Sequence, residues 1–428
     1  MRDWSDIPRE SGYDVLVCGS GMGGITAACA AAESGLNVGV VEYFGELGGI
    51  PVSGGLGSIS GFSRAGVTAV EGFARKFADA LGSRGKNCVQ SGGQNINIPP
   101  TEIDRYIWEL FDFYGIEARL YTHLIDAVTV DGRITEAVVA AKEGLRRIPA
   151  KLFIDATGDG DLAALAYAPF ALGRESDGKV QSATLVFVIG GIDKSRMPAY
   201  MDVRKVWKSA PRPVPIDHSV FQFVPHNEFS NEIAVNMTHC LNADPLSAKG
   251  LTAIRRECVK QAHYLMEEFF RKEIPGFEHA WISRFAPQIG VRESRRVLGD
   301  YLLTVDDVLE GRHFPDEIAC GIWSIDVHDP DGVHTGVSQR LERTYGIPWR
   351  CITPRGLANL LIAGRPISAD HVAFSSSRIN ATCMAIGEAA GLAASQAIAA
   401  GDTRKVDVAA LRERLRSVRY RAFASDGD

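Results

Sequence analysis

The chain has 428 residues, of which 46% are hydrophobic and 23% charged. This composition is typical of a folded protein and excludes a disordered one, and the length predicts two or more lobes. Basic and acidic residues are interspersed, and the net charge is −6. Because there is no basic tract, we expect no nucleic-acid partner.

The sequence contains no uninterrupted apolar stretch of about 18 residues, the length that a membrane helix needs. Its first residues lack the apolar core of a signal peptide, so we expect a cytoplasmic protein without a membrane span. The eight cysteines stand singly, with no C-x-x-C pair. This spacing argues against an iron–sulfur cluster, a structural zinc site and a redox-active dithiol.

Residues 13–49 predict a strand–helix–strand unit that binds a dinucleotide. An apolar run leads into Gly19-x-Gly21-x-x-Gly24, a helix of small residues follows, and a second apolar run ends in Glu42. Gly19 permits the tight turn, Gly21 lets backbone amides approach a pyrophosphate, and Gly24 lets the helix lie close to the sheet. Glu42 stands where a carboxylate can accept hydrogen bonds from an adenosine ribose.

Three later segments accompany this unit. They are Asp155-Ala156-Thr157-Gly158-Asp159-Gly160-Asp161, then residues 291–296 with Gly299-Asp300-Tyr301, and residues 359–368 with the helix beginning near Arg378. Together with the first unit they resemble the single-chain FAD-dependent oxidoreductases related in layout to the fumarate reductase and succinate dehydrogenase flavoproteins. The resemblance covers most of the chain; it is specific for FAD and unspecific for the substrate.

The resemblance implies an α/β fold, namely a Rossmann-type FAD-binding domain with an inserted α+β substrate domain. We expect residues 1–173 and 346–428 to form the FAD-binding domain, the second range as a return segment with C-terminal helices, and residues 174–345 to form the substrate domain. Relatives that bind the flavin covalently are expected to use a histidine within 45–65, where this chain has none, so we expect non-covalent FAD. The residues expected to contact it are Gly19, Gly21, Met22, Gly23, Gly24, Glu42, Tyr43, Leu47, Gly48, Gly49, Leu124, Thr157, Gly158, Asp161, Gly364, Arg365, Ser377 and Asn380.

Several of these positions have two open interpretations. Asp159 and Asp161 contact the cofactor or cap the helix that starts near Leu162. Arg365 replaces the ribitol-binding Asp of many such flavoproteins and cannot accept a hydrogen bond, so it reaches a phosphate or a carboxylate. The serines at 375–377 are N-cap candidates, or the helix N-terminus behind them points at the flavin pyrimidine ring. Gly387 and the small residues around it predict close packing of this helix against a neighbour.

The candidate catalytic residues are polar side chains of the inserted region and its borders. Arg292, together with its neighbours Arg295 and Arg296, is expected to face an anionic substrate; the alternative is a structural ion-pair network with Glu293 and Asp300. His328 and His371 are candidate proton donors or acceptors. Tyr345 or Arg350 lines the mouth of the active site or belongs to an interdomain hinge.

No metal site is expected. Residues 326–334 hold two histidines and three aspartates, but their spacing matches no familiar ligand pattern, and Asp-Pro-Asp-Gly predicts a turn.

The predicted function is transfer of a hydride between flavin N5 and a small organic substrate. Because the site is rich in arginine, we expect this substrate to be an anion. Dehydrogenase, oxidase and ene-reductase stay open, as do the electron acceptor and the oligomeric state, a homodimer included. No second G-x-G-x-x-G follows residue 60, which argues against a bound nicotinamide. The alternative is a non-catalytic flavin-binding or electron-transfer subunit that works with a partner protein; the large insertion weighs against it.

Overall fold

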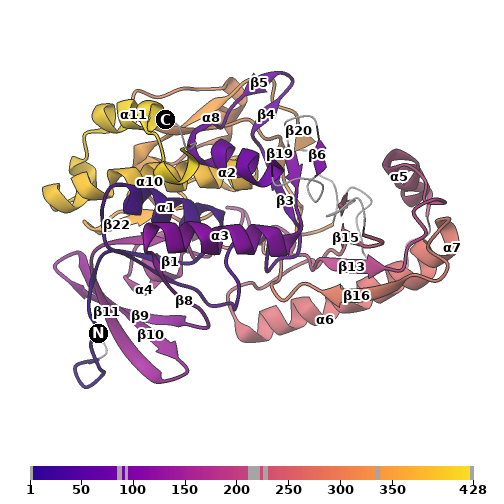
Figure 1. Ribbon diagram of the computed structural model, residues 1–428, viewed down its shortest axis with the longest axis horizontal. Coiled ribbons are helices and arrows are strands. Elements are labelled where there is room, and N and C mark those ends of the chain that lie inside the picture. The colour runs from indigo at the N-terminus through magenta and orange to yellow at the C-terminus, as the bar shows by residue number, and fades with distance from the viewer. Residues whose placement is uncertain are drawn as a thin grey trace.

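The computed structural model describes residues 3–83, 89–91, 95–210, 222–224, 230–332 and 338–424. The two ends of the chain belong to one large body, from which a smaller unit projects (Figure 1). The proline-rich linker expected at 211–215 lies outside the described residues. The fold is α/β, as predicted.

A mixed sheet forms the centre of the body, in the order β8-β2-β1-β11-β10-β9, with β22 paired to β11. β11 is long enough to join two kinds of sheet: its second half runs parallel to β1 and β22, and its first half is antiparallel to β10. The alternation of apolar residues at 116–150 predicts a meander of short strands, and in the structure this meander is continuous with the nucleotide-binding sheet. The strands are β1 (Tyr13–Cys18), β2 (Val38–Val41), β8 (Glu117–Arg119), β9 (His123–Val130), β10 (Arg133–Ala141), β11 (Gly144–Asp155) and β22 (Leu360–Ile362).

The helices α1 (Met22–Glu33) and α10 (Asn380–Ala400) pack closely against each other. A Cβ on Gly387 would stand 2.1 Å from the carbonyl oxygen of Gly23, and one on Gly391 would stand 2.3 Å from that of Ala27. The close packing predicted from the small residues is confirmed. Among the described residues α10 is long and apolar enough to cross a membrane, but 67% of its most apolar window is buried inside the protein, as in the core helix of a soluble domain.

The body contains further helices (Figure 1). They are α2 (Gly72–Ser83), α3 (Pro100–Tyr114), α4 (Asp161–Leu165), α8 (Val305–Glu310), α9 (His371–Ser377) and α11 (Val408–Ser417), with 3₁₀ turns η2 (Trp349–Cys351), η3 (Thr403–Lys405) and η4 (Arg421–Phe423). Short strands complete the body: β3 (Ser58–Ser60), β4 (Ser63–Arg64), β5 (Val67–Thr68), β6 (Val89–Ser91), β7 (Asn95–Asn97), β12 (Phe170–Leu172), β17 (Arg295–Val297), β18 (Glu317–Gly321), β19 (Ile325–Asp326), β20 (Ser338–Gln339) and β21 (Tyr345–Pro348).

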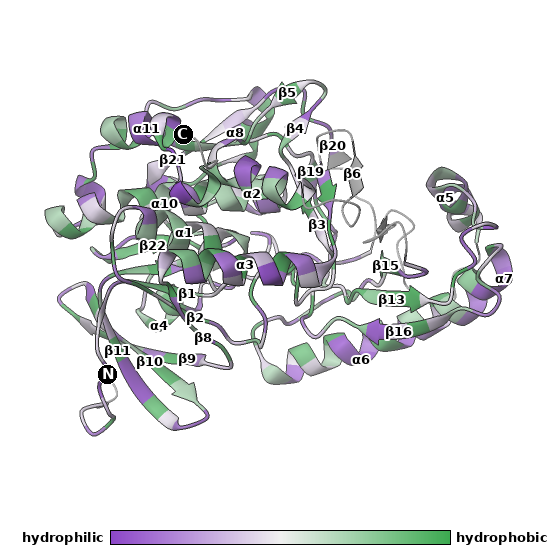
Figure 2. Cartoon of the chain, viewed as in Figure 1, coloured by the Kyte–Doolittle hydropathy of each residue, from purple (hydrophilic) through white to green (hydrophobic). Residues whose placement is uncertain are grey.

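The projecting unit is an antiparallel sheet covered by a long helix. The strand order is β14-β15-β13-β16, and α6 carries both hydrophobic and hydrophilic residues (Figure 2). Its apolar residues Ile254, Cys258 and Ala262 pack against the strands, as expected for an amphipathic helix. The elements are β13 (Phe187–Gly190), α5 (Tyr200–Ser209), β14 (Gln222–Val224), β15 (Ile233–Asn236), α6 (Ala248–Tyr264), the π-helix η1 (Leu265–Phe270), α7 (Arg271–Glu273) and β16 (Trp281–Phe285).

The inserted range expected at 174–345 divides between two hydrophobic cores. Apolar residues from 183 to 289 pack in the projecting unit, whereas Val297, Leu303, Val308 and Tyr345 belong to the core of the body. β17 pairs with β12, and β21 pairs with β18. We therefore propose that the substrate domain is shorter than 174–345 and ends near residue 290.

Candidate functional site

Two glycines of the first turn are required by the chain's own backbone. Gly19 has φ +99°, and a Cβ there would stand 2.3 Å from the carbonyl oxygen of Ala156. A Cβ on Gly24 would stand 2.1 Å from the carbonyl oxygen of Gly19. These glycines hold β1, α1 and the end of β11 together whether or not a ligand is present. Gly23 is similar, with its Cβ position 2.8 Å from the amide nitrogen of Gly364.

Gly21 is different, because nothing in the protein requires a glycine there. Its φ of −62° and ψ of 174° suit any residue, and a Cβ would meet no atom within 4 Å. Gly21 is the N-cap of α1 and makes no side-chain cap, so the first amides of the helix, including that of Met22, face a position suited to an anion. This open approach to a helix N-terminus fits a bound diphosphate.

The Leu47-Gly48-Gly49 segment lies against the same turn. The amide of Gly48 donates to the carbonyl oxygen of Ser20 at 2.9 Å, and a Cβ on Gly49 would stand 2.9 Å from Cα of Gly21. The amide of Leu47 donates to Oδ1 of Asp104 at 3.0 Å. The segment therefore forms a second wall of the expected diphosphate site.

Glu42 follows β2 and is bound to the turn. Its Oε2 accepts hydrogen bonds from the amide and Oγ of Ser20, both at 2.7 Å, and its Oε1 accepts one from the amide of Phe44 at 2.8 Å. A carboxylate oxygen has two lone pairs, so Oε1 keeps an acceptor position for a ribose hydroxyl. The sequence pattern did not indicate that Ser20 anchors this carboxylate.

The region beyond Glu42 holds Tyr43 and Leu124, two further residues that are expected to contact FAD. Tyr43 is 55% exposed, and its ring centroid lies 4.1 Å from that of His123, which begins β9 and precedes the half-buried Leu124. The amide of Thr122 donates to the carbonyl oxygen of Glu42 at 2.8 Å. Tyr43 and Leu124 therefore lie on adjoining segments at the end of β2.

Asp155, rather than Asp159 or Asp161, supports the start of α4. Its Oδ2 accepts from the amide of Ala163 at 2.8 Å, and its Oδ1 accepts from Oγ1 of Thr157, also at 2.8 Å. The N-cap position is Gly160, which has no side chain to make a cap. The prediction that Asp159 or Asp161 caps this helix is wrong, because the preceding strand already supplies the carboxylate.

Arg365 was expected to reach a phosphate or a carboxylate, and the structure shows the carboxylate. Its Nη2 pairs with Oδ1 of Asp159 at 2.6 Å, and it lies over Gly158, whose Cβ position is 3.3 Å from Nη2. The other nitrogen, Nη1, is buried without a hydrogen-bond partner among the described residues. At Gly364 φ is +90°, and a Cβ would meet no atom within 4 Å. Arg365 therefore pairs with a carboxylate through one nitrogen, and the expected contact of a second nitrogen with a cofactor phosphate stays a prediction.

The serines at 375–377 do not cap α10. They lie inside α9, whose N-cap is Asp370, and Ser377 is buried, with Oγ donating to the carbonyl oxygen of Phe374 at 3.4 Å. The N-cap of α10 is Ile379, which makes no side-chain cap, and Nδ2 of Asn380 donates to the carbonyl oxygen of Ser58 at 3.4 Å. The uncapped start of α10 fits the interpretation in which this N-terminus serves a ligand.

The glycine-rich segment that follows residue 50 connects this N-terminus to the projecting unit. A Cβ on Gly61 would stand 2.8 Å from Cγ2 of Ile379, and one on Gly55 would stand 3.1 Å from Cβ of Ala286. The segment packs closely on both sides. Its Gly- and Ser-rich sequence at 50–66 predicts close packing on a flat ligand, and this stays a prediction.

A charged cluster lies where the projecting unit meets α9 and α10. We define it as Arg292, Asp326, His328 and Arg378, and refer to it as the Arg–His cluster. Nε2 of His328 lies 3.3 Å from Oδ2 of Asp326, and Nη2 of Arg378 lies 3.6 Å from the same oxygen. Arg292 is 7% exposed, and its Nη1 donates to the carbonyl oxygen of Ser182 at 2.9 Å. The side chain of Asp326 is 38% exposed, so the cluster borders open space.

The ionisation of the cluster follows from its burial and from its two guanidinium groups. Burial, then the charge of Arg292, lowers the pKa of His328 to about 4, although Asp326 opposes this. Burial alone would raise the pKa of Asp326, but His328, Arg378 and Arg292 outweigh it and hold that pKa well below its usual range. Burial, then Arg378, lowers the pKa of Arg292 to about 9. Near neutral pH the cluster therefore has two cations, one anion and a neutral imidazole.

Several buried polar atoms around the cluster have no hydrogen-bond partner among the described residues. They include Nε of Arg378, Nε2 of Gln181 and Oγ of Ser182. Buried polar groups are normally paired, so unpaired donors beside a positive cluster indicate a polar ligand. Burial lowers the pKa of Arg378, and the charge of Arg365 lowers it further, so Arg365 lies near the cluster.

Comparison with known proteins identifies the family. The family model for FAD dependent oxidoreductases matches residues 14–415. The chain belongs to the FAD-dependent oxidoreductase family. Its cofactor is FAD, and the turn at Gly21, the buried nitrogen of Arg365 and the uncapped helix starts are features of this chain that fit it.

Individual relatives are more distant. The tRNA uridine 5-carboxymethylaminomethyl modification enzyme MnmG of Treponema pallidum is 30% identical over 131 residues, which are 29% of this chain and 20% of that enzyme. The chain thus spans about one fifth of the curated relative it matches. Among solved structures, a geranylgeranyl bacteriochlorophyll reductase-like protein of Thermoplasma acidophilum is 13% identical, with a TM-score of 0.47, 97% of this chain covered and 90% of that one. A flavin-dependent brominase is also 13% identical, with a TM-score of 0.48, 95% of this chain covered and 84% of that one.

Other candidate catalytic residues of this oxidoreductase bind protein groups instead. Nδ1 of His371 lies 2.9 Å from Oε2 of Glu293, and Nη1 of Arg296 pairs with Oε1 of the same carboxylate. Nη1 of Arg295 pairs with Oδ1 of Asp161 at 2.7 Å. The structural ion-pair alternative is therefore right for Arg296, which pairs with Glu293, whereas Arg295 pairs with Asp161 and with neither of the expected partners. A role of His371 as a proton carrier stays a prediction, although its Nδ1 already lies beside Glu293.

Tyr345 does not line an opening. It is 0% exposed, and its hydroxyl lies 2.9 Å from Oγ of Ser376; burial raises its pKa. The expected place at the mouth of the active site is wrong, because β21 pairs inside the body. Arg350 is exposed and pairs with Asp316 at 2.9 Å.

Sequence reasoning missed part of the cluster. Arg378 was noted only as the start of a helix, and Asp326 only within a rejected metal pattern. Arg292 and Arg378 reach Asp326 and His328 from distant segments of the chain, and no local spacing could indicate that contact. Gln181 had no sequence signal at all.

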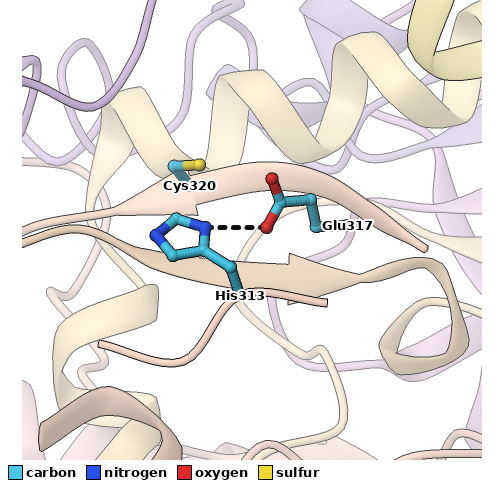
Figure 3. A group of neighbouring side chains, drawn as sticks. All are labelled: His313, Glu317 and Cys320. Carbon is cyan, nitrogen blue, oxygen red and sulfur yellow. Dashed lines mark hydrogen bonds and ion pairs between the residues drawn. The ribbon is translucent and has the colours of Figure 1, made fainter. Parts of the chain in front are cut away.

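One group of side chains on the outer side of the body has metal-ligating atoms close together. They are His313, Glu317 and Cys320, whose ligand atoms lie within 4.8 Å of one another (Figure 3). Nδ1 of His313 and Oε2 of Glu317 form an ion pair at 2.8 Å, and Arg412 lies 3.5 Å from the other oxygen of Glu317. These pairings account for the arrangement, and we assign no metal to it. His334 of the pattern weighed above lies outside the described residues.

Non-covalent attachment of FAD remains a prediction. No histidine occupies 45–65, and in the described part of that range there is no side chain of the kind expected to form the linkage. We expect acid precipitation of the purified enzyme to release its yellow colour into the supernatant. Absorbance measured on supernatant and redissolved pellet checks this, and colour that stays with the pellet would show a covalent bond.

Proposed function

We propose that this enzyme transfers a hydride between FAD and a carbon of a small organic anion bound by the Arg–His cluster. The observation that supports the proposal is the pair of buried guanidinium groups, Arg292 and Arg378, whose charges both act on the single carboxylate of Asp326. With Asp326 ionised and His328 neutral, the cluster keeps a net positive charge. A buried net charge without a counter-ion is costly, so an anionic ligand is favoured there.

When bound, FAD supplies the group that accepts or gives the hydride at N5. The residues of the chain bind and orient. Arg292 is held by the carbonyl oxygen of Ser182, and Arg378 by the carbonyl oxygen of Asp326 at 3.2 Å. Both guanidinium groups are thus fixed before an anion arrives, which lowers the entropy cost of binding. The unpaired Nε of Arg378 is a donor for a carboxylate oxygen.

The proposal is tested by anion binding to the FAD-loaded enzyme. Small carboxylates and their neutral amides are titrated while the flavin absorbance is followed. We expect carboxylates to perturb the spectrum and amides to do so far more weakly. Arg292→Met should raise the carboxylate Kd about 10- to 100-fold, since a charge-assisted hydrogen bond is worth about 1.5–3 kcal/mol.

The matched control is Arg284→Met. Arg284 lies on β16 of the same unit, is half exposed and pairs with Glu232 at 2.9 Å, so its loss should leave the Kd unchanged. Arg292→Lys should recover part of the affinity. Equal binding of carboxylates by wild type and Arg292→Met, with FAD fully bound in both, would contradict the proposed anion site.

A further inference from the structure

His328 and Asp326 form a pair whose geometry is fixed from several sides. Nε2 of His328 lies 3.3 Å from Oδ2 of Asp326. The amide of Asp326 donates to Oγ of Ser375 at 3.0 Å. The amide of His328 donates to Oε1 of Gln181 at 3.3 Å, and its carbonyl oxygen accepts from the amide of Ser182 at 3.1 Å. The pair is thus attached both to α9 and to the projecting unit.

The charges around the pair set the tautomer of the imidazole. The titratable and charged groups that face His328 are Asp326, Arg292, Arg378 and, with ring centroids 6.3 Å apart, His239. Since Asp326 is ionised, it accepts the N–H of a neutral His328 at Nε2. Nδ1 then keeps its lone pair, and no hydrogen bond to it is found among the described residues. A carboxylate that orients a neutral imidazole in this way prepares it to accept a proton.

We infer that His328, oriented by Asp326, accepts a proton from the substrate, and that the substrate is a 2-hydroxy or 2-amino carboxylate. The inference rests on the proposed function. The C–H bond at the 2-position breaks and its electron pair leaves as hydride to the flavin. The O–H or N–H proton passes to Nδ1 of His328, and a C=O or C=N bond forms. Two electrons leave the substrate, and FAD is reduced.

The position of the hydroxyl or amino group follows from the compactness of the cluster. The guanidinium of Arg378 and the imidazole of His328 both approach Oδ2 of Asp326. A carboxylate on the arginines and an acidic proton on His328 therefore belong to neighbouring carbons of one small molecule. The opposite reaction class, reduction of an enoate, needs a proton donor. Burial and the charge of Arg292 favour the neutral form of His328, which suits a proton acceptor rather than a donor.

The test is anaerobic reduction of the bound flavin by a panel of carboxylates. We expect 2-hydroxy or 2-amino carboxylates to bleach the flavin and their 3-substituted isomers not to do so. His328→Gln keeps an N–H for Asp326 but has no basic lone pair. Its rate of flavin reduction should fall at least about 100-fold, the size of a general-base contribution. The Kd of the matching carboxylate without the hydroxyl, read from the flavin spectrum, should stay within about threefold.

Asp326→Asn separates positioning from structural damage. The substitution raises the charge of the cluster by one, so the same unreactive carboxylate should bind several-fold more tightly while flavin reduction slows. A merely structural role would weaken both. Tighter binding with slower reduction supports the inference.

The remaining outcomes are distinct. Reduction by His328→Gln as fast as by wild type would overturn the inference, as would reactivity confined to enoates, and either leaves the anion site intact. Failure of every carboxylate to bind the FAD-loaded enzyme would overturn both the inference and the proposed function.

Discussion

Valine at position 21 is expected to remove FAD from the protein without unfolding it. The backbone of Gly21 has dihedral angles that valine adopts, and a Cβ meets no protein atom within 4 Å. The added side chain therefore occupies only the place where a diphosphate approaches the first amides of α1. We expect Gly21→Val to purify colourless, with the Kd for FAD raised at least about 100-fold. Flavin absorbance measures how much FAD the purified variant carries, and a fluorescence titration with FAD measures its Kd.

The matched comparison is Gly24→Ala in the same turn. Its Cβ would stand 2.1 Å from the carbonyl oxygen of Gly19, so this variant should lose stability in the unliganded protein, as a steric clash in the core does. Gly21→Val should match the unliganded wild type in urea unfolding. Full flavin occupancy in Gly21→Val would show that the turn does not bind the cofactor.

Glu388 is expected to make the stability of the protein fall as the pH rises. It is 4% exposed on α10, and its Oε1 accepts from the amide of Phe73 at 3.0 Å and from the hydroxyl of Tyr420 at 2.9 Å. Burial raises its pKa from 4.5 to about 7. The folded state therefore favours the neutral carboxyl, and this contribution is complete below about pH 4.5 and lost as the pH rises through about 7.

Glu388→Gln isolates this effect. The amide keeps the Oε1 acceptor but does not ionise, so from pH 5 to pH 8.5 the wild type should lose about 3 kcal/mol of unfolding free energy relative to the variant. Urea unfolding at the two pH values measures the difference. Glu413→Gln, an exposed acid on α11, should show no such difference. Parallel pH dependences of wild type and Glu388→Gln would refute a shifted carboxyl.

The features that the sequence predicted correctly are those formed within one short stretch of the chain. The strand–turn–helix at Gly19 and Gly21 and the meander at 116–150 are patterns within one contiguous segment, and the structure has them at those places. The packing of α10 on α1 could also be predicted, because small residues at Gly387 and Gly391 have one physical use in a buried helix.

The predictions that proved wrong concern side chains for which the sequence allowed more than one place or partner in the fold. Asp161 was a reasonable helix cap, but it is the first residue of α4 itself, and the amide of Ala163 donates to Asp155 instead. Tyr345 was a reasonable mouth residue, but strand pairing inside the body buries it. The Arg–His cluster combines three segments, around Arg292, Asp326–His328 and Arg378, that meet only in the folded chain, and periodicity and spacing do not predict such contacts.

The account depends most on FAD bound at the junction of β1 and α1, and flavin content tests this most directly. Protein purified under native conditions is measured for absorbance, then stripped and titrated with FAD and with competing ADP. The account predicts a single FAD per chain, with ADP competing for the same place. A folded chain that neither carries nor takes up FAD would contradict it.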